Sequence, residues 1–159
     1  MMTIEKLVSK KKIASFLSKL SSENSIDVSG LIISQFDQIL QEEKFDQNSY
    51  YSAQAVLDFI WEKLNTGHWS NVDIIWRQLF TIISVIKVLI VLDIIKDKNS
   101  DNDHDNNFIM RDVVKICDIG LLMGAPVLDN ICSQLASFFC QKVQMIENIN
   151  LSNGKLNPR

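Results

Sequence analysis

Apolar side chains recur at steps of three and four residues along most of the chain. Because an α-helix turns once every 3.6 residues, this spacing places them on one helix face. Two stripes are clearest and predict helices over about residues 28–40 and 53–64: Val28, Leu31, Ile32, Phe36, Ile39 and Leu40, then Ala53, Val56, Leu57, Ile60, Trp61 and Leu64. The second helix is predicted to end at Gly67, since glycine takes the left-handed conformation that often follows a helix end.

The N-terminal segment, residues 4–20, does not follow a single stripe. Its first apolar residues face one side of a continuous helix, and its later ones face the opposite side. Such a segment is either sandwiched between partners or divided into two short helices. The opposed groups are Ile4, Leu7 and Val8 on one side, and Ile13, Phe16, Leu17 and Leu20 on the other.

The middle of the chain predicts a long helix that begins after a capping box. Ser70 and Asp73 have the spacing of that motif, with Asp in place of the usual Glu. The helix is expected to run to about Lys96. It is too often interrupted to resemble a membrane span of about 18 apolar residues, so a central core helix is the better interpretation. Between residues 79 and 95 its polar positions are Thr81, Ser84, Lys87 and Asp93.

The C-terminal third predicts an antiparallel helix hairpin. One helix is expected from about Phe108, and the Gly124-Ala125-Pro126 sequence breaks it. Proline suits the first position of the next helix, where its missing N–H costs nothing. Gly120 and Gly124 are expected to let the hairpin partner approach closely. The apolar faces of the two helices are Ile109, Val113, Ile116, Cys117, Gly120 and Leu121, and Val127, Leu128, Ile131, Leu135, Phe138, Phe139, Val143 and Ile146.

These elements predict an all-α fold of about six helices, arranged as three antiparallel hairpins around a central hydrophobic helix. Five Gly and two Pro are few turn-forming residues for a many-stranded β fold, which needs a turn between each pair of strands. Residues 1–147 are expected to form a single helical domain, with a polar Asp/Asn-rich loop at 97–107. Residues 148–159 are expected to form a flexible tail or linker.

Composition and charge narrow the classes of partner. A 47% hydrophobic and 22% charged composition is that of an ordinary globular domain, and the net charge of −3 favours neither nucleic acid nor an anionic membrane. The cysteines Cys117, Cys132 and Cys140 are odd in number and widely spaced, which predicts buried thiols in a reducing compartment. We therefore expect a nuclear or cytoplasmic protein that contacts neither nucleic acid nor membrane directly.

The sequence offers no catalytic, cofactor-binding or metal-binding constellation. Neither of its two histidines, His68 and His104, starts the His-x-Asp/Glu pattern of a non-haem iron site. A near-match to a calcium loop begins at Asp97 but has Asn102 where a turn glycine belongs and Phe108 where a bidentate Glu belongs. Phosphate loops, nucleophile elbows and zinc patterns are likewise missing.

A candidate surface for binding a partner lies around the turn before the central helix. Trp69 falls in that turn, and Trp and Arg are enriched in binding hot spots. Asp73 and Arg77 stand four residues apart, so they are expected to pair on the helix surface. Trp69, Asp73 and Arg77 are the residues that we assign to this surface, whereas Trp61, on its helix's apolar stripe, is expected to pack in the core.

Two stretches also carry a family resemblance, which covers about half the chain, from near Leu57 to near Leu135. They are Trp61-Glu62-Lys63-Leu64-Asn65-Thr66-Gly67-His68-Trp69, continuing to Trp76-Arg77, and Ile116-Cys117-Asp118-Ile119-Gly120-Leu121-Leu122-Met123-Gly124-Ala125. Together they resemble the N-terminal helical region of the Jumonji-C family of bifunctional peptidases and arginyl-hydroxylases, also named lysine-specific demethylase eight.

The resemblance implies a parent enzyme that uses Fe(II), 2-oxoglutarate and oxygen to hydroxylate arginyl residues in proteins; demethylase and histone-tail peptidase activities are also attributed to the family. It places the iron and 2-oxoglutarate ligands in a C-terminal β-helix domain that has no counterpart here. The leading hypothesis is thus a non-catalytic N-terminal domain that recruits a partner protein or packs on its own catalytic domain. A free-standing helical adaptor for a peptide or partner helix is the alternative. An enzyme using Asp118 or Asp129 is a third, disfavoured hypothesis.

Overall fold

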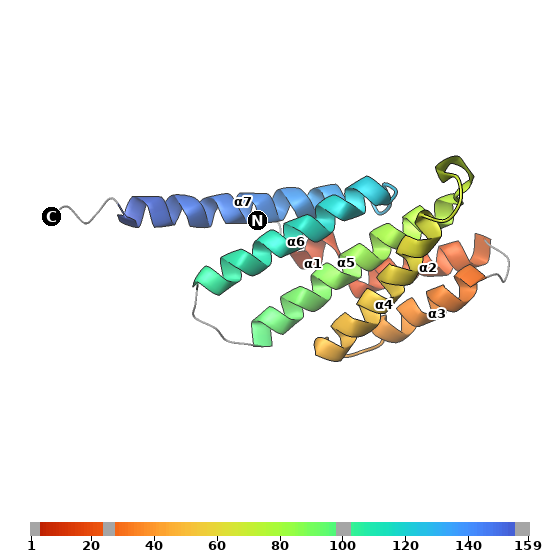
Figure 1. Ribbon diagram of the computed structural model, residues 1–159. Coiled ribbons are helices and arrows are strands. Elements are labelled where there is room, and N and C mark those ends of the chain that lie inside the picture. The colour runs from red at the N-terminus through yellow and green to blue at the C-terminus, as the bar shows by residue number, and fades with distance from the viewer. Residues whose placement is uncertain (1–3, 24–27, 98–102, 155–159) are drawn as a thin grey trace.

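A computed structural model describes residues 4–23, 28–97 and 103–154, and within these ranges the chain is helical with no strand. The predicted all-α class is confirmed. The helices are α1 (Ile4–Leu7), α2 (Lys10–Glu23), α3 (Val28–Leu40), α4 (Gln47–Leu64), the 3-10 turn η1 (Trp69–Asn71), α5 (Ile74–Asp97), α6 (Asp103–Met123) and α7 (Ile131–Gly154) (Figure 1).

Successive helices pack as antiparallel neighbours, in agreement with the predicted hairpins. α2 packs on α3, α4 on α5, and α6 on α7, while α3–α4 and α5–α6 contacts join the pairs (Figure 1). α5 contacts α3, α4, α6 and α7, which makes it the centre of the fold. The C-terminal end of α7 projects beyond the other helices (Figure 1).

Helix α5 is the core helix that the hydrophobic run predicted. By length and composition its residues Ile74–Lys96 would suit a membrane span, but 61% of its most apolar stretch is buried inside the molecule. A helix that is apolar nearly all round belongs in a core when other helices surround it. Its fully buried side chains are Leu79, Phe80, Ile82, Ile83, Val85, Ile86, Val88 and Ile90.

The N-terminal segment is divided into two helices, which resolves the two alternatives left by its opposed faces. α1 ends at Leu7 and α2 begins at Lys10, so the chain redirects its second apolar face toward the same core. In α3 the prediction that Leu31 lies on the buried apolar face was wrong. Leu31 is 73% exposed, and Ile33 is buried in its place at 4%.

The residues that cap the starts of α5 and α4 differ from the prediction. α5 is capped by Asp73, whose carboxylate accepts the Ile75 N–H at 3.1 Å. Ser70 belongs to η1 and does not form the predicted capping box. A genuine capping box was missed at α4, where Asp46 and Ser49 exchange side-chain to backbone hydrogen bonds of 3.0 Å each.

The hairpin of α6 and α7 is longer at both ends than predicted. α6 begins at Asp103 rather than near Phe108, and α7 continues to Gly154, through part of the predicted tail. Residues 98–102, which hold much of the calcium-loop near-match, and residues 155–159 lie outside the described residues. The division into a domain of residues 1–147 and a linker stays a prediction.

Helix α7 does not begin at Pro126. Three consecutive residues, Leu128 to Asn130, take left-handed φ angles of 51°, 56° and 57°, and the helix starts only at Ile131. Such angles are uncommon for residues other than glycine. The hairpin turn is therefore wider than the Gly-Ala-Pro sequence alone suggested.

The two glycines of α6 and its C-terminal turn face the central helix α5, a contact that the helical periodicity did not predict. A Cβ on Gly124 would lie 2.0 Å from Thr81 Oγ1 of α5. A Cβ on Gly120 would lie 2.9 Å from Cys132 Sγ of α7 and 3.2 Å from Ser84 Cβ of α5. Their missing side chains thus let α6 close on α5, while Gly120 also meets the hairpin partner as expected.

A buried threonine secures this approach. Thr81 is 2% exposed, and its hydroxyl donates to the Ala125 carbonyl at 2.9 Å while accepting the Ala125 N–H at 2.9 Å. The N–H and the carbonyl of the half-buried Ala125 thus both have a hydrogen-bond partner, which avoids the cost of leaving them unpaired. The turn that follows α6 is held directly on α5.

We predict that Gly124→Ala lowers the free energy of unfolding by about 2 kcal/mol or more, since overpacking here displaces the Thr81 hydroxyl and the Gly120 backbone oxygen. Gly30→Ala is the matched control. Gly30 lies in α3, and a Cβ added there would meet nothing within 4 Å, so the change should stabilise by about 0.5–1 kcal/mol. Urea unfolding measures both, and equal effects would contradict the close α5–α6 contact.

Candidate protein-binding surface

The predicted surface around the central turn is exposed. Trp69 is 71% exposed, and its ring stacks on His68 with centroids 5.7 Å apart and planes 29° from parallel. His68 Nδ1 lies 2.6 Å from Ser70 Oγ, so the imidazole is held by its own turn. The Trp69 side chain is thereby presented to solvent on an ordered 3-10 turn.

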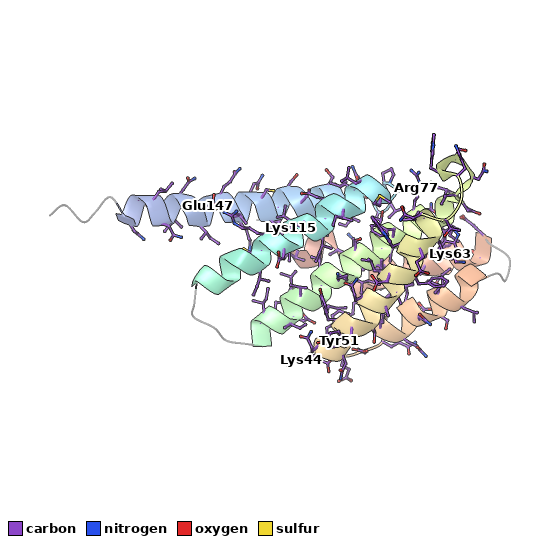
Figure 2. All side chains as sticks on the ribbon, in the orientation of Figure 1. Lys44, Tyr51, Lys63, Arg77, Lys115 and Glu147 are labelled. Carbon is purple, nitrogen blue, oxygen red and sulfur yellow. The ribbon has the colours of Figure 1, made fainter. Side chains whose placement is uncertain are left out.

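Asp73 and Arg77 do not form the predicted ion pair in the described structure. The Asp73 carboxylate is used to cap α5 by accepting the Ile75 N–H. Arg77, near the N-terminal end of α5, is half-buried (Figure 2). The structure keeps the three residues within one region, but each has a different local role.

A groove begins next to this region and follows α5 between α4 and α6. It is a hollow of about 360 Å³ whose floor is a single helical stripe, Phe80, Ser84 and Lys87. Asp73 and Arg77 precede Phe80 on the same stripe by helical spacing. The walls are Gln54, Leu57 and Trp61 from α4, and Ile116, Ile119, Leu122 and Met123 from α6.

The groove walls expose large apolar side chains. Trp61 is 42% exposed, Ile119 47% and Leu122 80%. Trp61 also packs on the buried Phe80 ring, with centroids 6.0 Å apart, so the predicted packing role accounts for only part of its surface. An apolar cluster of this kind on a small domain is typical of a binding surface.

The floor of the groove holds a nearly buried cation, Lys87, which is 7% exposed. Its ammonium donates to Gln54 Oε1 at 2.7 Å and lies 5.0 Å from the Tyr50 ring centroid. Gln54 in turn donates to the exposed Asp58 at 2.7 Å. Burial lowers the pKa of Lys87, and the Asp58 charge partly opposes that shift.

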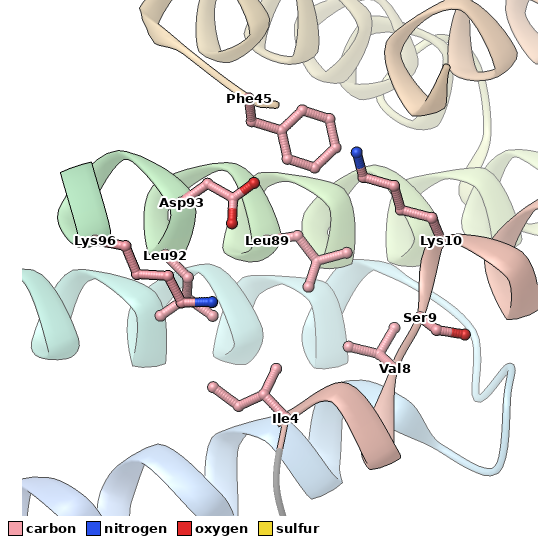
Figure 3. A pocket seen from close by; sticks show the side chains of 9 residues that line it. All are labelled: Ile4, Val8, Ser9, Lys10, Phe45, Leu89, Leu92, Asp93 and Lys96. Carbon is pink, nitrogen blue, oxygen red and sulfur yellow. The ribbon is translucent and has the colours of Figure 1, made fainter. Parts of the chain in front are cut away.

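A second hollow, of about 460 Å³, lies where the α1–α2 junction meets α5 (Figure 3). Lys10 spans its rim, with its ammonium 3.9 Å from the Phe45 ring centroid and 2.6 Å from the Glu42 carbonyl oxygen. Asp93 and Lys96 of α5 lie across from it (Figure 3). Its charged groups are of both signs, so it favours no particular ligand.

The buried cysteines Cys117 and Cys132 do not form a reactive site. Burial is the main cause that raises the pKa values of Cys117 and Cys132 to about 12, which leaves both as neutral thiols. Cys140 is exposed, so the prediction that all three are buried was wrong for it.

Metal-ligating side chains do not gather anywhere in the part of the chain that the structure describes: no group of three or more His, Cys, Asp or Glu could hold an ion. His68 is engaged with Ser70, and the side chain of His104 lies outside the described residues. These residues do not fit the Fe(II) ligand set of a 2-oxoglutarate oxygenase, which takes two His and a carboxylate.

Comparison with known proteins finds similarity to part of one enzyme. The chain is 36% identical over 92 residues to lysine-specific demethylase 8 of Danio rerio, covering 58% of this chain and 20% of that protein. It is 26% identical over 84 residues to lysine-specific demethylase 8 of Xenopus tropicalis, covering 53% and 16%. No family model and no solved structure matches. The chain is thus related to a region that makes up at most a fifth of these relatives.

We predict that Lys87→Met raises the free energy of unfolding by about 1 kcal/mol, because it removes a buried charge that lacks an ionic partner in the described structure. Lys115→Met, at an exposed lysine that pairs with Asp112 at 3.4 Å, should change it by less than about 0.5 kcal/mol. Thermal and urea unfolding measure the two variants side by side.

We also predict that the stability difference between the wild type and Lys87→Met depends on pH. Folded Lys87 loses its proton below the ordinary value of 10.5, whereas unfolded Lys87 keeps it up to that value. The unfolded state therefore binds more protons in this window, and wild-type stability should rise with pH relative to Lys87→Met. If the difference in free energy of unfolding between the wild type and Lys87→Met stays constant up to pH 10.5, the lowered pKa of Lys87 is contradicted.

Proposed function

We propose that this chain is a non-catalytic, N-terminal protein-interaction or regulatory domain of a Jumonji-C oxygenase, an Fe(II)- and 2-oxoglutarate-dependent protein arginyl hydroxylase. The observation that carries the proposal is the similarity to about a fifth of lysine-specific demethylase 8 in a chain whose described residues lack an iron-binding group. Fe(II) and 2-oxoglutarate would then be bound elsewhere in the parent protein, in the nucleus or the cytoplasm.

The domain would act through its surface rather than through chemistry. Its partner is either a separate protein or the catalytic domain of the same parent, and neither nucleic acid nor membrane is needed. Trp69 offers an exposed aromatic ring on the turn before α5, and Arg77 offers a half-buried cation one helical turn before Phe80, which lines the groove between α4 and α6. Aromatic and arginine side chains with adjoining apolar surface are the usual anchors of protein interfaces.

A free-standing adaptor is the second candidate. The observation that favours it is the groove over α5 between helices of two neighbouring hairpins, since amphipathic peptides commonly bind in grooves of this kind. An adaptor would bind its peptide without any oxygenase attached. The two candidates share the binding surface and differ in whether a catalytic domain belongs to the same polypeptide.

The proposal is tested by incubating the purified chain with Fe(II), 2-oxoglutarate, oxygen and arginine-containing peptides. Succinate formation, measured by NMR, should stay at the rate without protein, and calorimetry should detect no stoichiometric iron or 2-oxoglutarate binding. Full-length Danio rerio lysine-specific demethylase 8 serves as the comparison protein. Hydroxylated peptide, or one equivalent of bound iron with 2-oxoglutarate, would overturn the proposal.

A further inference from the structure

We infer that the groove between α4 and α6 binds an amphipathic helix of a partner protein, and that a carboxylate on this helix pairs with Lys87. The inference rests on the proposed interaction function and names the kind of partner. Three features carry it: the apolar walls of the groove, the arrangement of three helices around it, and the cation Lys87 at its floor. Among the described residues Lys87 has no direct counter-ion.

The apolar walls give the partner helix its hydrophobic contact. Trp61 stands on the α4 side, and Ile119 and Leu122 stand on the α6 side. All three are at least 42% exposed, although the helices that carry them pack tightly on α5 below. Large apolar side chains from one face of a helix would remove this surface from water.

The floor supplies the charge that selects the partner. Lys87 makes its hydrogen bond to the neutral Gln54, and no ion pair involving Lys87 occurs among the described residues. The nearest compensating anion, Asp58, is exposed and is reached through Gln54. Because burying a charge without a direct counter-ion is costly, a carboxylate entering the groove would gain more here than at an exposed lysine.

A second cation lies on the same stripe. Arg77 precedes Lys87 by ten residues, which a helical rise of 1.5 Å per residue converts to about 15 Å. Asp73, on this stripe as well, is occupied in capping α5. The groove therefore has cations near both ends and apolar surface between them, the complement of an apolar helix face flanked by acidic residues.

The framing helices favour a helical occupant. α4 and α6 run on either side of α5, so that α5 forms the floor of a trough along its own axis (Figure 1). A further helix laid along this trough would pack on α4 and α6 as the helices of the domain already pack on one another. Apolar anchors at positions i, i+3, i+4 and i+7 would then face the trough.

The test selects the partner chemistry without presupposing a sequence. A phage library of 16-residue helical peptides, randomised on one face, is panned against the full chain. Enriched peptides should combine large apolar residues at helical spacing with Asp or Glu on the same face. Their affinity is then measured by fluorescence anisotropy, with each acidic residue also replaced by Asn or Gln.

Neighbouring leucines provide a matched pair of variants. Leu122→Glu should weaken binding about tenfold or more, whereas Leu121→Glu, at a leucine that is 41% exposed but does not line the groove, should leave it unchanged. Lys87→Met should weaken binding of the acidic peptide but not of the peptide in which Gln replaces the acidic residue. Circular dichroism checks the fold of every variant.

Several outcomes would overturn the inference. These are panning that yields no binder, binders without acidic enrichment, or loss of binding in Leu121→Glu but not in Leu122→Glu. Sedimentation showing a dimer of the chain that Leu122→Glu dissociates would do the same. None of these results bears on 2-oxoglutarate turnover, so a failure of the inference can be distinguished from a failure of the proposed function.

Discussion

The fold depends on the hydrogen bonds between the buried hydroxyl of Thr81 and the backbone of Ala125. They join positions 44 residues apart and fix the turn after α6 on the central helix. The contact is possible only because Gly124 has no side chain, since a Cβ there would collide with Thr81. With the turn fixed, α6 lies close along α5, and its outer side chains become the wall of a groove whose opposite wall is α4.

Lys87 is a buried charge that lowers the stability of the domain and that a carboxylate of a partner protein could pair with. Every neighbouring position of α5 that is fully buried is apolar or a small hydroxyl residue, yet this one holds an ammonium group beside Gln54. A methionine would fill similar space without the desolvation cost. Retaining the charge makes physical sense if a partner carboxylate completes the site, because the low exposure that penalises the free lysine strengthens the pair.

Periodicity predicted the helices and the core helix well, because burial of an apolar face follows directly from a spacing of 3.6 residues. It placed Leu31 on the apolar face although this side chain is exposed. It located the break between α6 and α7 but not the start of α7, because the spacing of apolar residues does not show the left-handed turn at 128–130. The groove was also invisible in the sequence. Ile119 and Leu122 belonged to no predicted apolar face, and only the packing of α6 on α5 through its glycines makes them the wall of a hollow.

Native-state hydrogen exchange tests the central claim most directly. The Ala125 amide, bonded to Thr81 Oγ1, should exchange as slowly as the amides of α5. In Thr81→Val, which keeps the shape but removes the hydroxyl, Ala125 and the facing ends of α6 and α7 should exchange at least about tenfold faster, while α2 and α3 change little. Free exchange of Ala125 in the wild type, or unchanged rates in the variant, would contradict the account.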